Sequence, residues 1–217
     1  MKTNNGLVRY CIAQLGKPYW YGTFGHKASE SLLRQKSTQY PAFYKDKDFV
    51  TQYGEKVHDC SGLIKGYLWC DSEEGFYNPE KYDPEIDGSI DSDHCSEKGN
   101  IDNMPEIKGL LLFYPGHVGV YIGNGKVIEA RGHAYGVVET NLRERPWNTW
   151  GKLDFITYKK PPRVFKDGEE LAALDFLVEH GRIDSDMKDY WTSAIDMIKY
   201  EKYIFIKWAN DVSEMDA

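Results

Sequence analysis

The sequence HDCSGL at residues 58–63 decides the fold of this chain, because a cysteine stands there between a polar, turn-like segment and an apolar run. Ser61 and Gly62 are typical of a helix start, and residues 63–68 continue with apolar side chains at helical spacing. A thiol at a helix N-terminus lies at the positive end of the macrodipole, which favours the thiolate. Cys60 is therefore a candidate nucleophile. The alternative is that Cys60 is a small buried hydrophobic residue.

Length and composition describe a folded globular chain of 217 residues, 41% hydrophobic and 14% aromatic. Such a chain can form one full core, or one core with a small appendage. The net charge of -7 gives no general electrostatic reason to bind nucleic acid or an anionic membrane. No apolar run approaches membrane-spanning length, so no membrane insertion is expected. The first six residues do not resemble a secretory signal, and we expect a protein made in the cytoplasm without a signal peptide.

The four cysteines, at positions 11, 60, 70 and 95, match no zinc-ligand spacing. A disulfide scaffold is not expected in a chain of this size with an ordinary core. We predict that Cys11 and Cys70 are core thiols on amphipathic helices and that Cys95 is a loop thiol. No metal site is predicted.

The N-terminal part predicts a helix followed by an aromatic turn. Residues 6–15 place four side chains on one helical face, namely Leu7, Tyr10, Cys11 and Leu15. Gly16 and Pro18 then end the helix, and PYWYG at residues 18–22 leads into a glycine turn.

Two long polar stretches flank the helix expected after Cys60, and both are predicted to be insertions. Residues 24–58 are weakly periodic, with one short helix expected around Ser29–Gln35. Residues 71–106 are acidic and rich in proline and glycine, which favours a solvated loop.

The second half of the chain predicts successive strands, at residues 108–114, 117–122, 126–130, around 137–142 and at 153–158. Strands that follow an N-terminal helical part indicate an α+β arrangement. Val118, Val120 and Ile122 alternate with His117, Gly119 and Tyr121, so this strand has two distinct faces.

The register of the hairpin around Gly123-Asn124-Gly125 determines whether Glu129 can contact His117. A two-residue loop pairs Glu129 with Val120 and turns it away from the histidine. A three-residue loop with a glycine bulge pairs Ile122 with Lys126 and Gly119 with Glu129, on the same face as His117. Both loops are common. We adopt the bulged hairpin, because only it lets the carboxylate orient the imidazole.

Residues 159–163, KKPPR, are the best domain boundary in the chain. Beyond it, short amphipathic helices are predicted at residues 169–180, 189–200 and 203–210. We therefore expect a domain over residues 1–160 and a small helical module over residues 161–217. The module either has a targeting role or stabilises the main domain.

Three motifs in order carry a resemblance to a known family. They are GKPYWYG at residues 16–22, DCSGL at 59–63 and HVGVYIG at 117–123. A cysteine at a helix start, a histidine on a two-faced strand and a polar residue on the next strand follow the papain-type arrangement. The chain resembles the NlpC-type family of bacterial and phage cell-wall cysteine peptidases over residues 6–158.

The resemblance implies a minimal papain-like fold, a helix packed on an antiparallel sheet. It also implies hydrolysis of amide bonds in peptidoglycan stem peptides, usually between D-γ-glutamate and the following diamino acid. Carried over by position, Cys60 is the nucleophile, His117 the general base and Tyr19 a helper of the oxyanion hole. Asp59 and Ser61 flank the nucleophile, where relatives contact the substrate's amino end. No metal or organic cofactor is required.

The chain departs from the family pattern at the orienting position, where Glu129 replaces the more usual histidine or amide. A carboxylate can accept the Nδ1–H of His117 and favour the imidazolium. Tyr21-Gly22-Thr23 replaces paired glycines, and the two insertions should reshape the cleft. His58 and His133 are local alternatives to His117 and Glu129, and we expect them to be surface or capping groups.

Several functions remain open on this scaffold. They are a D-γ-glutamyl-diamino acid endopeptidase, an N-acetylmuramoyl-L-alanine amidase, a cross-bridge endopeptidase, and an inactive wall-binding protein. A wall hydrolase without a leader would be a phage or prophage endolysin, or a cargo exported by other machinery.

Overall fold

The computed structural model describes residues 2–45, 48–87, 90, 92–158, 169–188, 191–192 and 201–216. The chain divides into two compact units, Met1–Lys159 and Lys160–Ala217, which are described separately. In the first unit the helices are α1 (Asn4–Ala13), α2 (Glu30–Gln39), α3 (Pro41–Tyr44), α4 (Cys60–Trp69) and α5 (Pro84–Asp87). Its strands are β1 (Phe24–Lys27), β2 (Lys56–His58), β3 (Cys95–Asn100), β4 (Leu111–Tyr114), β5 (His117–Gly123), β6 (Lys126–Ala130), β7 (Val137–Asn141) and β8 (Thr149–Leu153).

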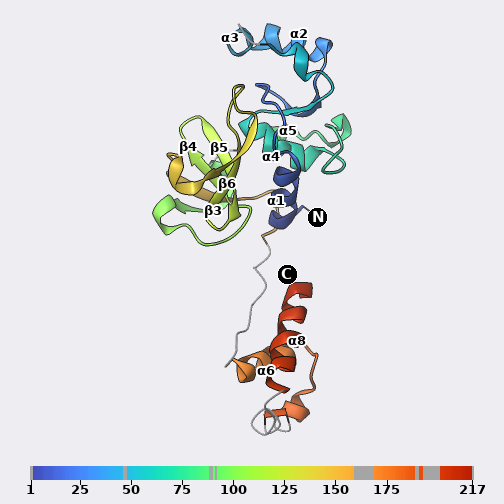
Figure 1. The fold of residues 1–217 in the computed structure, drawn as a ribbon, viewed down its shortest axis with the longest axis vertical. Helices are drawn as coiled ribbons and strands as arrows, with labels where there is room; N and C mark the ends of the chain where they lie inside the picture. Colours follow the sequence, from blue (N-terminus) through green and yellow to red (C-terminus); the bar gives the residue numbers. More distant parts are fainter. Residues whose placement is uncertain are drawn as a thin grey trace. The chain divides into compact units, whose positions relative to one another are not determined.

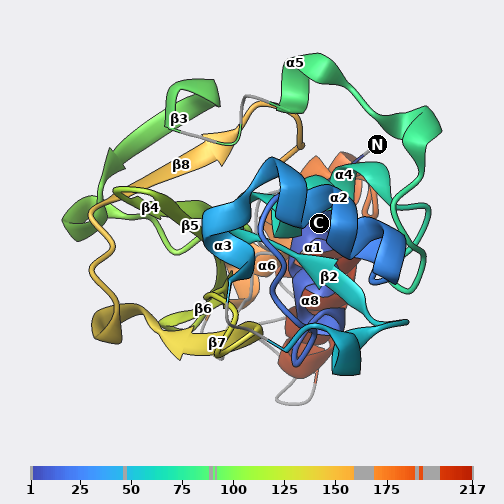
Figure 2. The same cartoon turned by 90° about the horizontal axis from the view of Figure 1, so that it is seen from above.

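A six-stranded antiparallel sheet in the order β3-β8-β4-β5-β6-β7 forms the body of the first unit. Helices α1 and α4 lie along one side of this sheet (Figures 1 and 2) and contact β5. Residues of both helices and of the central strands share one core, which includes Leu7, Ile64, Val120 and Ile128. The α+β fold expected from the sequence, a helix packed on an antiparallel sheet, is confirmed.

Helix α4 begins at Cys60 because Asp59 caps it. The Oδ1 atom of Asp59 accepts a hydrogen bond from the Gly62 N–H at 2.6 Å. Such a cap contributes about 1 kcal/mol. The helix therefore begins at Cys60, one residue before the start predicted at Ser61 and Gly62, because the Asp59 carboxylate caps it there. Leu63 and Ile64 are fully buried on the sheet side, each contributing about 1.5–3 kcal/mol.

Helix α1 lies where it was predicted but ends earlier. Leu7, Tyr10 and Cys11 are buried as expected. The helix stops at Ala13 with Gln14 as its C-cap, so Leu15 falls beyond the helical face and is 38% exposed. The prediction that Leu15 belongs to the buried face was wrong.

The hairpin between β5 and β6 combines features of the two loops considered. Asn124 and Gly125 form a two-residue loop, both with positive φ, and Gly123 pairs with Lys126. The predicted pairing of Ile122 with Lys126 is wrong. An irregularity between Tyr121 and Gly123 shifts the register by one residue, so Val120 pairs with Ile128. Extended by one residue, this register sets Gly119 opposite Glu129, which is the register that the bulged hairpin predicted.

Two other strand predictions need correction. The last strand, β8, spans Thr149–Leu153, whereas the strand had been expected at 153–158. Gly151 suits this position, since a Cβ there would meet the Cys95 sulfur at 2.5 Å. Cys95, predicted to be a loop thiol, is buried at the start of β3. Cys11 and Cys70 are buried thiols, as predicted. Cys11 lies on helix α1, whereas Cys70 is the extended residue that follows α4, so its predicted place on a helix is wrong.

The 24–58 insertion is more ordered than expected. It carries the β1–β2 pair and the helices α2 and α3, where one short helix around Ser29–Gln35 was predicted. These elements enclose a small core of their own, formed by Trp20, Ala28, Leu32, Tyr44, Phe49 and Val57. The 71–106 stretch, predicted to be a loop, contains α5 and the edge strand β3.

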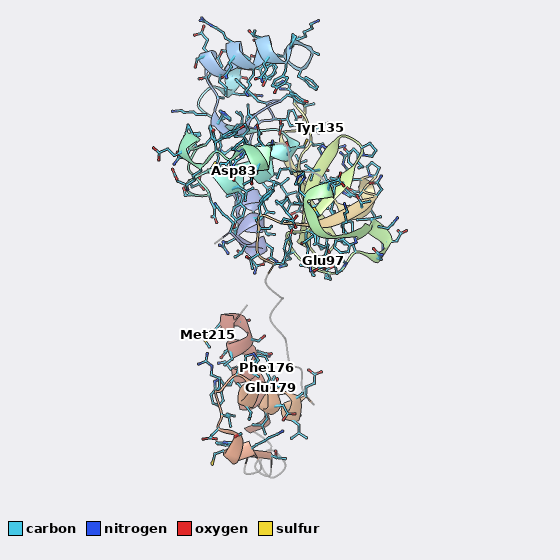
Figure 3. All side chains as sticks on the ribbon, turned by 180° about the vertical axis from the view of Figure 1, so that it is seen from behind. Asp83, Glu97, Tyr135, Phe176, Glu179 and Met215 are labelled. Atoms are coloured by element: carbon cyan, nitrogen blue, oxygen red, sulfur yellow. The ribbon has the colours of Figure 1, made fainter. Side chains whose placement is uncertain are left out.

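The second unit contains helices α6 (Glu170–Glu179) and α8 (Glu201–Asp216). The helices predicted at 169–180 and 203–210 therefore exist, the latter with a longer span. Their core includes Leu174, Phe176 and Leu177 from α6 and Ala209 and Val212 from α8; Figure 3 labels Phe176. The boundary predicted at 159–163 and most of the helix predicted at 189–200 lie outside the described residues.

Within the described residues, no helix combines the length and the apolar character that crossing a bilayer requires.

Candidate active site

The start of α4 and the start of β5 border one cavity of about 480 Å³. Cys60 and Ser61 line it from the helix, and Tyr114, His117 and Val118 line it from the β4–β5 hairpin. We call it the Cys60 cavity. Cys60 thus shares this cavity with His117 and with Val118, the residue that follows it.

The environment of Cys60 does not favour its ionised form. Burial raises the pKa of the Cys60 thiol to about 11, with a further contribution from the Asp59 carboxylate. The N–H groups of Ser61 and Val118 act in the opposite direction but do not prevail. The helix dipole favours the thiolate, whereas burial and the Asp59 carboxylate oppose it. A thiol in this environment needs a base to remove its proton.

His117 is held in place by a buried carboxylate. Its Nε2 lies 2.7 Å from Glu129 Oε2, and Glu129 is fully buried. Burial alone would raise the pKa of Glu129, but hydrogen bonds from His117, Arg145 and Thr140 lower it to about 2. Since an ionised carboxylate can only accept, His117 Nε2 carries the proton. The Nδ1 atom is then the basic nitrogen, the reverse of the predicted contact through Nδ1–H.

Arg145 and Thr140 complete the network around Glu129. Arg145 donates from Nε to Oε1 at 2.8 Å and from Nη2 to Oε2 at 2.9 Å, and Thr140 Oγ1 donates to Oε1 at 2.8 Å. Arg145 Nη2 also donates to the Tyr114 hydroxyl at 2.6 Å. This bidentate arginine neutralises the buried charge. Neither Arg145 nor Thr140 was predicted from the sequence.

Two aromatic rings restrict the His117 imidazole. The Trp147 ring is stacked on it with centroids 5.8 Å apart and planes inclined by 22°. Tyr114, on β4, pairs with His117, and the centroids of the two rings are 5.0 Å apart. Neither aromatic residue was predicted from the sequence to contact His117.

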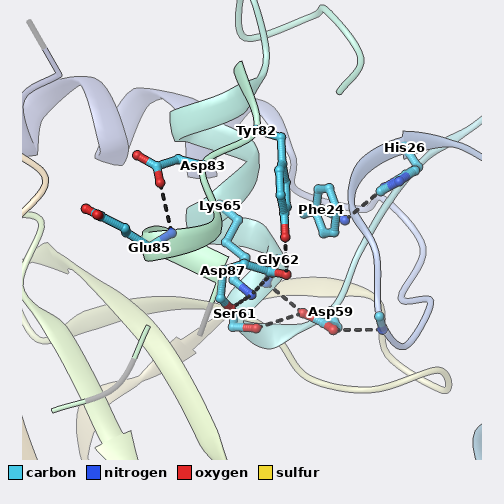
Figure 4. A network of polar contacts seen from close by, with 11 residues as sticks. Phe24, His26, Asp59, Ser61, Gly62, Lys65, Tyr82, Asp83, Glu85 and Asp87 are labelled. Carbon is cyan, nitrogen blue, oxygen red and sulfur yellow. Dashed lines mark hydrogen bonds and ion pairs between the residues drawn. The ribbon is translucent and has the colours of Figure 1, made fainter. Parts of the chain in front are cut away.

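Tyr19 and Asp59 are brought close to Cys60 by the segment that precedes α4. Tyr19 forms a parallel bridge with His58, two residues before Cys60. Burial is the main cause that raises the pKa of Tyr19, and the nearby Cys60 is the second. The Asp59 carboxylate accepts hydrogen bonds from Gly62 N–H, from the Ser61 hydroxyl at 3.2 Å and from Gly22 N–H at 2.8 Å (Figure 4). Asp59 therefore also ties the aromatic turn to the nucleophile helix.

The two alternative histidines lie elsewhere. His58 is fully buried, with its Nε2 3.0 Å from the Tyr10 hydroxyl, so its prediction as a surface or capping group is wrong. The half-buried ring of His133 lies 4.5 Å from the ring of Phe49. Glu129 is the residue that contacts His117. Among the described side chains, no three histidine, cysteine, aspartate or glutamate residues gather closely enough to hold a metal ion.

A thiol and a carboxylate-bound imidazole in one cavity define a cysteine-peptidase type of site. Residues 16–153 match the NlpC/P60 family, and the chain belongs to this family. Members of the family are cysteine peptidases that act on peptidoglycan.

Solved structures of the same family resemble this chain. The peptidoglycan hydrolase RipB from Mycobacterium tuberculosis is 21% identical, with a TM-score of 0.40, over 71% of this chain and 65% of that one. The P60 domain of antigen MAP1204 from M. avium subspecies paratuberculosis is 22% identical, with a TM-score of 0.37, over 71% of this chain and 98% of that one. The NlpC/p60 domain of the peptidoglycan hydrolase SagA is 15% identical, with a TM-score of 0.38, over 70% and 99%.

The chain thus spans just under two thirds of RipB. Among curated proteins, none matches the chain significantly.

Proposed function

We propose that this chain is a cysteine endopeptidase that hydrolyses amide bonds in peptidoglycan stem peptides, at the bond between D-γ-glutamate and the following diamino acid. The observation that carries the proposal is that Cys60 and His117 border one cavity, with His117 bound to an ionised, buried Glu129. Membership of the NlpC/P60 family supports the substrate class. The choice of bond comes from the resemblance of the motifs around Cys60 and His117.

In this mechanism His117 Nδ1 takes the proton from the Cys60 thiol as the sulfur attacks the amide carbonyl carbon. The backbone N–H of Cys60 and the Tyr19 hydroxyl stabilise the oxyanion. His117 returns its proton to the amine nitrogen as the carbon–nitrogen bond breaks and a thioester remains. Water then attacks the thioester carbon and gives one proton to His117. The carbon–sulfur bond breaks, His117 returns this proton to the sulfur, and the carboxylic acid product loses its remaining proton to solvent as it leaves.

Glu129 favours the proton transfer, because its negative charge stabilises the imidazolium that forms. Arg145 balances this charge when the imidazole is neutral. We assign no step to a metal ion or an organic cofactor.

The test is digestion of purified peptidoglycan by the wild-type chain and by C60A and C60S. Wild type should release amino groups, and both variants should lose this activity by at least a thousandfold. C95A is the matched control, since Cys95 is a buried thiol on β3 that does not line the Cys60 cavity. Undiminished release by C60A would refute the proposal.

Mass spectrometry of the released fragments identifies the bond. Free amino groups on the diamino acid and a terminal D-glutamate indicate the proposed endopeptidase. Cleavage between muramic acid and L-alanine indicates an N-acetylmuramoyl-L-alanine amidase, and cleavage in the cross-bridge indicates a cross-bridge endopeptidase. Binding to peptidoglycan with no release of fragments would identify an inactive wall-binding protein.

A further inference from the structure

A second cavity, of about 470 Å³, borders the residue before the nucleophile. Asp59 lines this cavity, whereas Cys60 and Ser61 line the Cys60 cavity, so the chain passes from one to the other at consecutive residues. The 24–58 insertion supplies much of its wall, through Gln35, Lys36, Gln39 and Tyr40. We call it the Lys36 pocket.

Lys36 is a buried lysine that forms no ion pair with the carboxylates whose positions the structure describes. Lys36 is only 7% exposed. Its ammonium nitrogen lies 6.0 Å from the ring centroid of Phe24 and 5.8 Å from that of Tyr40. In the part of the chain that the structure describes, no carboxylate lies within ion-pair distance of it. Burial lowers the pKa of Lys36, while the more distant Asp59 and Asp87 carboxylates act against this shift.

The other charged groups of the pocket already have partners. Lys65 pairs with Asp87 at 2.8 Å, and the Tyr82 hydroxyl donates to the same carboxylate at 2.9 Å (Figure 4). Both oxygens of Asp59 accept hydrogen bonds. The Lys36 ammonium is therefore the group in this pocket that an anion would stabilise most, because an unpaired buried charge is unfavourable.

We propose that the Lys36 pocket binds a free carboxylate on the acyl part of the substrate, and that Lys36 is a specificity-determining residue. The inference rests on the proposed function, and on the expectation from the family resemblance that Asp59 contacts the amino end of the substrate. When glutamate is linked through its γ-carboxyl group, its α-carboxylate stays free on the acyl side of the bond to be cleaved. The side-chain amides of Gln35 and Gln39 line the same pocket and can donate hydrogen bonds to it.

The pocket should therefore distinguish peptides that carry the free α-carboxylate from peptides in which this group is a carboxamide. Both have nearly the same shape, but only the carboxylate neutralises Lys36. We expect wild type to cleave L-Ala-γ-D-Glu-L-Lys with a kcat/KM about tenfold above that for L-Ala-γ-D-isoglutaminyl-L-Lys, mainly through KM.

The test compares this ratio in wild type, K36Q, K36R and K27Q. K36Q should bring the ratio below about twofold, and K36R, which keeps the charge, should retain most of the preference. K27Q is the matched control, because Lys27 belongs to the same insertion, at the exposed end of β1, and does not line the pocket. A ratio does not depend on the fraction of folded protein. Equal cleavage of the two peptides by wild type, or an unchanged ratio in K36Q, would overturn the inference.

Binding to the C60A variant, measured by calorimetry, separates this inference from the proposed function. Tighter binding of the carboxylate peptide that is lost in C60A/K36Q supports the pocket even if wild type cleaves neither peptide. Cleavage of both peptides with equal affinities in C60A supports the enzyme and rejects the pocket.

Discussion

Cys60 is partly exposed, and the desolvation of its thiol, together with the nearby Asp59 carboxylate, raises the thiol pKa to about 11. Below that pH the thiol is mostly protonated, and the thiolate fraction rises about tenfold per pH unit. We therefore expect alkylation of Cys60 by iodoacetamide to accelerate about tenfold per unit between pH 7 and pH 10. Mass spectrometry of the modified peptide measures the rate. A rate already constant at pH 7 would reveal a preformed thiolate instead.

The pKa of Glu129 predicts a specific acid sensitivity. Lowered from 4.5 to about 2 in the folded chain, it corresponds to about 3 kcal/mol of stability. This contribution is complete above about pH 4.5 and is lost as the pH falls through 2. Between pH 5 and pH 2, E129Q should lose about 3 kcal/mol less unfolding free energy than wild type in denaturant titrations. E139Q on β7, at a half-exposed carboxylate, is the control and should follow wild type.

Arg145 is a positioning residue, since it acts on the imidazole through Glu129. In R145M the buried carboxylate loses its counter-charge, so its pKa rises and Glu129 becomes protonated, and unable to accept the His117 N–H, at a higher pH than in wild type. We expect kcat/KM to fall at least tenfold and the acid limb of its pH profile to move to higher pH. R145K should restore part of both. A loss of activity with an unchanged pH profile would indicate that Arg145 only supports the fold.

For single residues, the sequence predicted the His117–Glu129 contact but not the Arg145 that neutralises Glu129 or the raised pKa of Cys60. Cys60, His117 and Glu129 stand out because their motifs and strand periodicity place them. Arg145 could not be predicted, since it follows β7 in a short connection where Arg143 is an equally plausible partner. The thiol pKa also depends on burial, which a local helix-dipole argument does not include.

Among the elements, the β5–β6 hairpin has the most direct effect on the site. Gly119 lies two residues after His117, and a Cβ there would meet the Trp147 ring at 2.7 Å and Val127 at 2.9 Å. G119A should therefore displace Trp147 from His117, lower kcat and destabilise the chain by about 1–3 kcal/mol. The double variant G119A/W147F should recover part of the stability, as a double-mutant cycle would measure. Additive losses would show that the two sites are independent.

The elements that were missed or misplaced share a physical reason. Strand β3 is an edge strand whose sequence CSEKGN is mostly exposed and polar, so it lacks the alternation by which strands are recognised. Its partner β8 contains Gly151 and Lys152, whereas the apolar run that attracted the prediction begins only at Leu153. Strand β3 is defined by pairing with β8, and β8 by pairing with both β3 and β4, which is non-local information.

For the whole molecule, the sequence was sufficient for the fold class because the order of helices, strands and motifs is a global property. The arrangement of the 24–58 insertion was not predictable in this way. Its core depends on Trp20, Phe49 and Val57, which lie far apart in sequence and carry no common period.

The two units each have their own core, which predicts that the first unit is independent of the second. Among the described residues, the α6–α8 core and the core around α1, α4 and the sheet are built from different side chains. Tyr158 closes the first unit, since its hydroxyl donates to the Gly109 carbonyl and accepts from the Leu153 N–H, both at 3.0 Å. A chain ending at residue 160 keeps these bonds.

We therefore expect residues 1–160 to unfold cooperatively and to cleave soluble stem peptides with a kcat/KM within about twofold of the full chain. A chain ending at residue 150 is the control, because it lacks most of the β8 pairing and Tyr158, and it should not fold. Thermal unfolding and peptide cleavage test both chains. If the chain of residues 1–160 cleaves soluble peptides normally but digests whole peptidoglycan much more slowly, the module 161–217 contributes to wall binding. If the chain of residues 1–160 fails to fold, the module 161–217 supplies part of the folding free energy of the first unit and is a stabilising part of the domain.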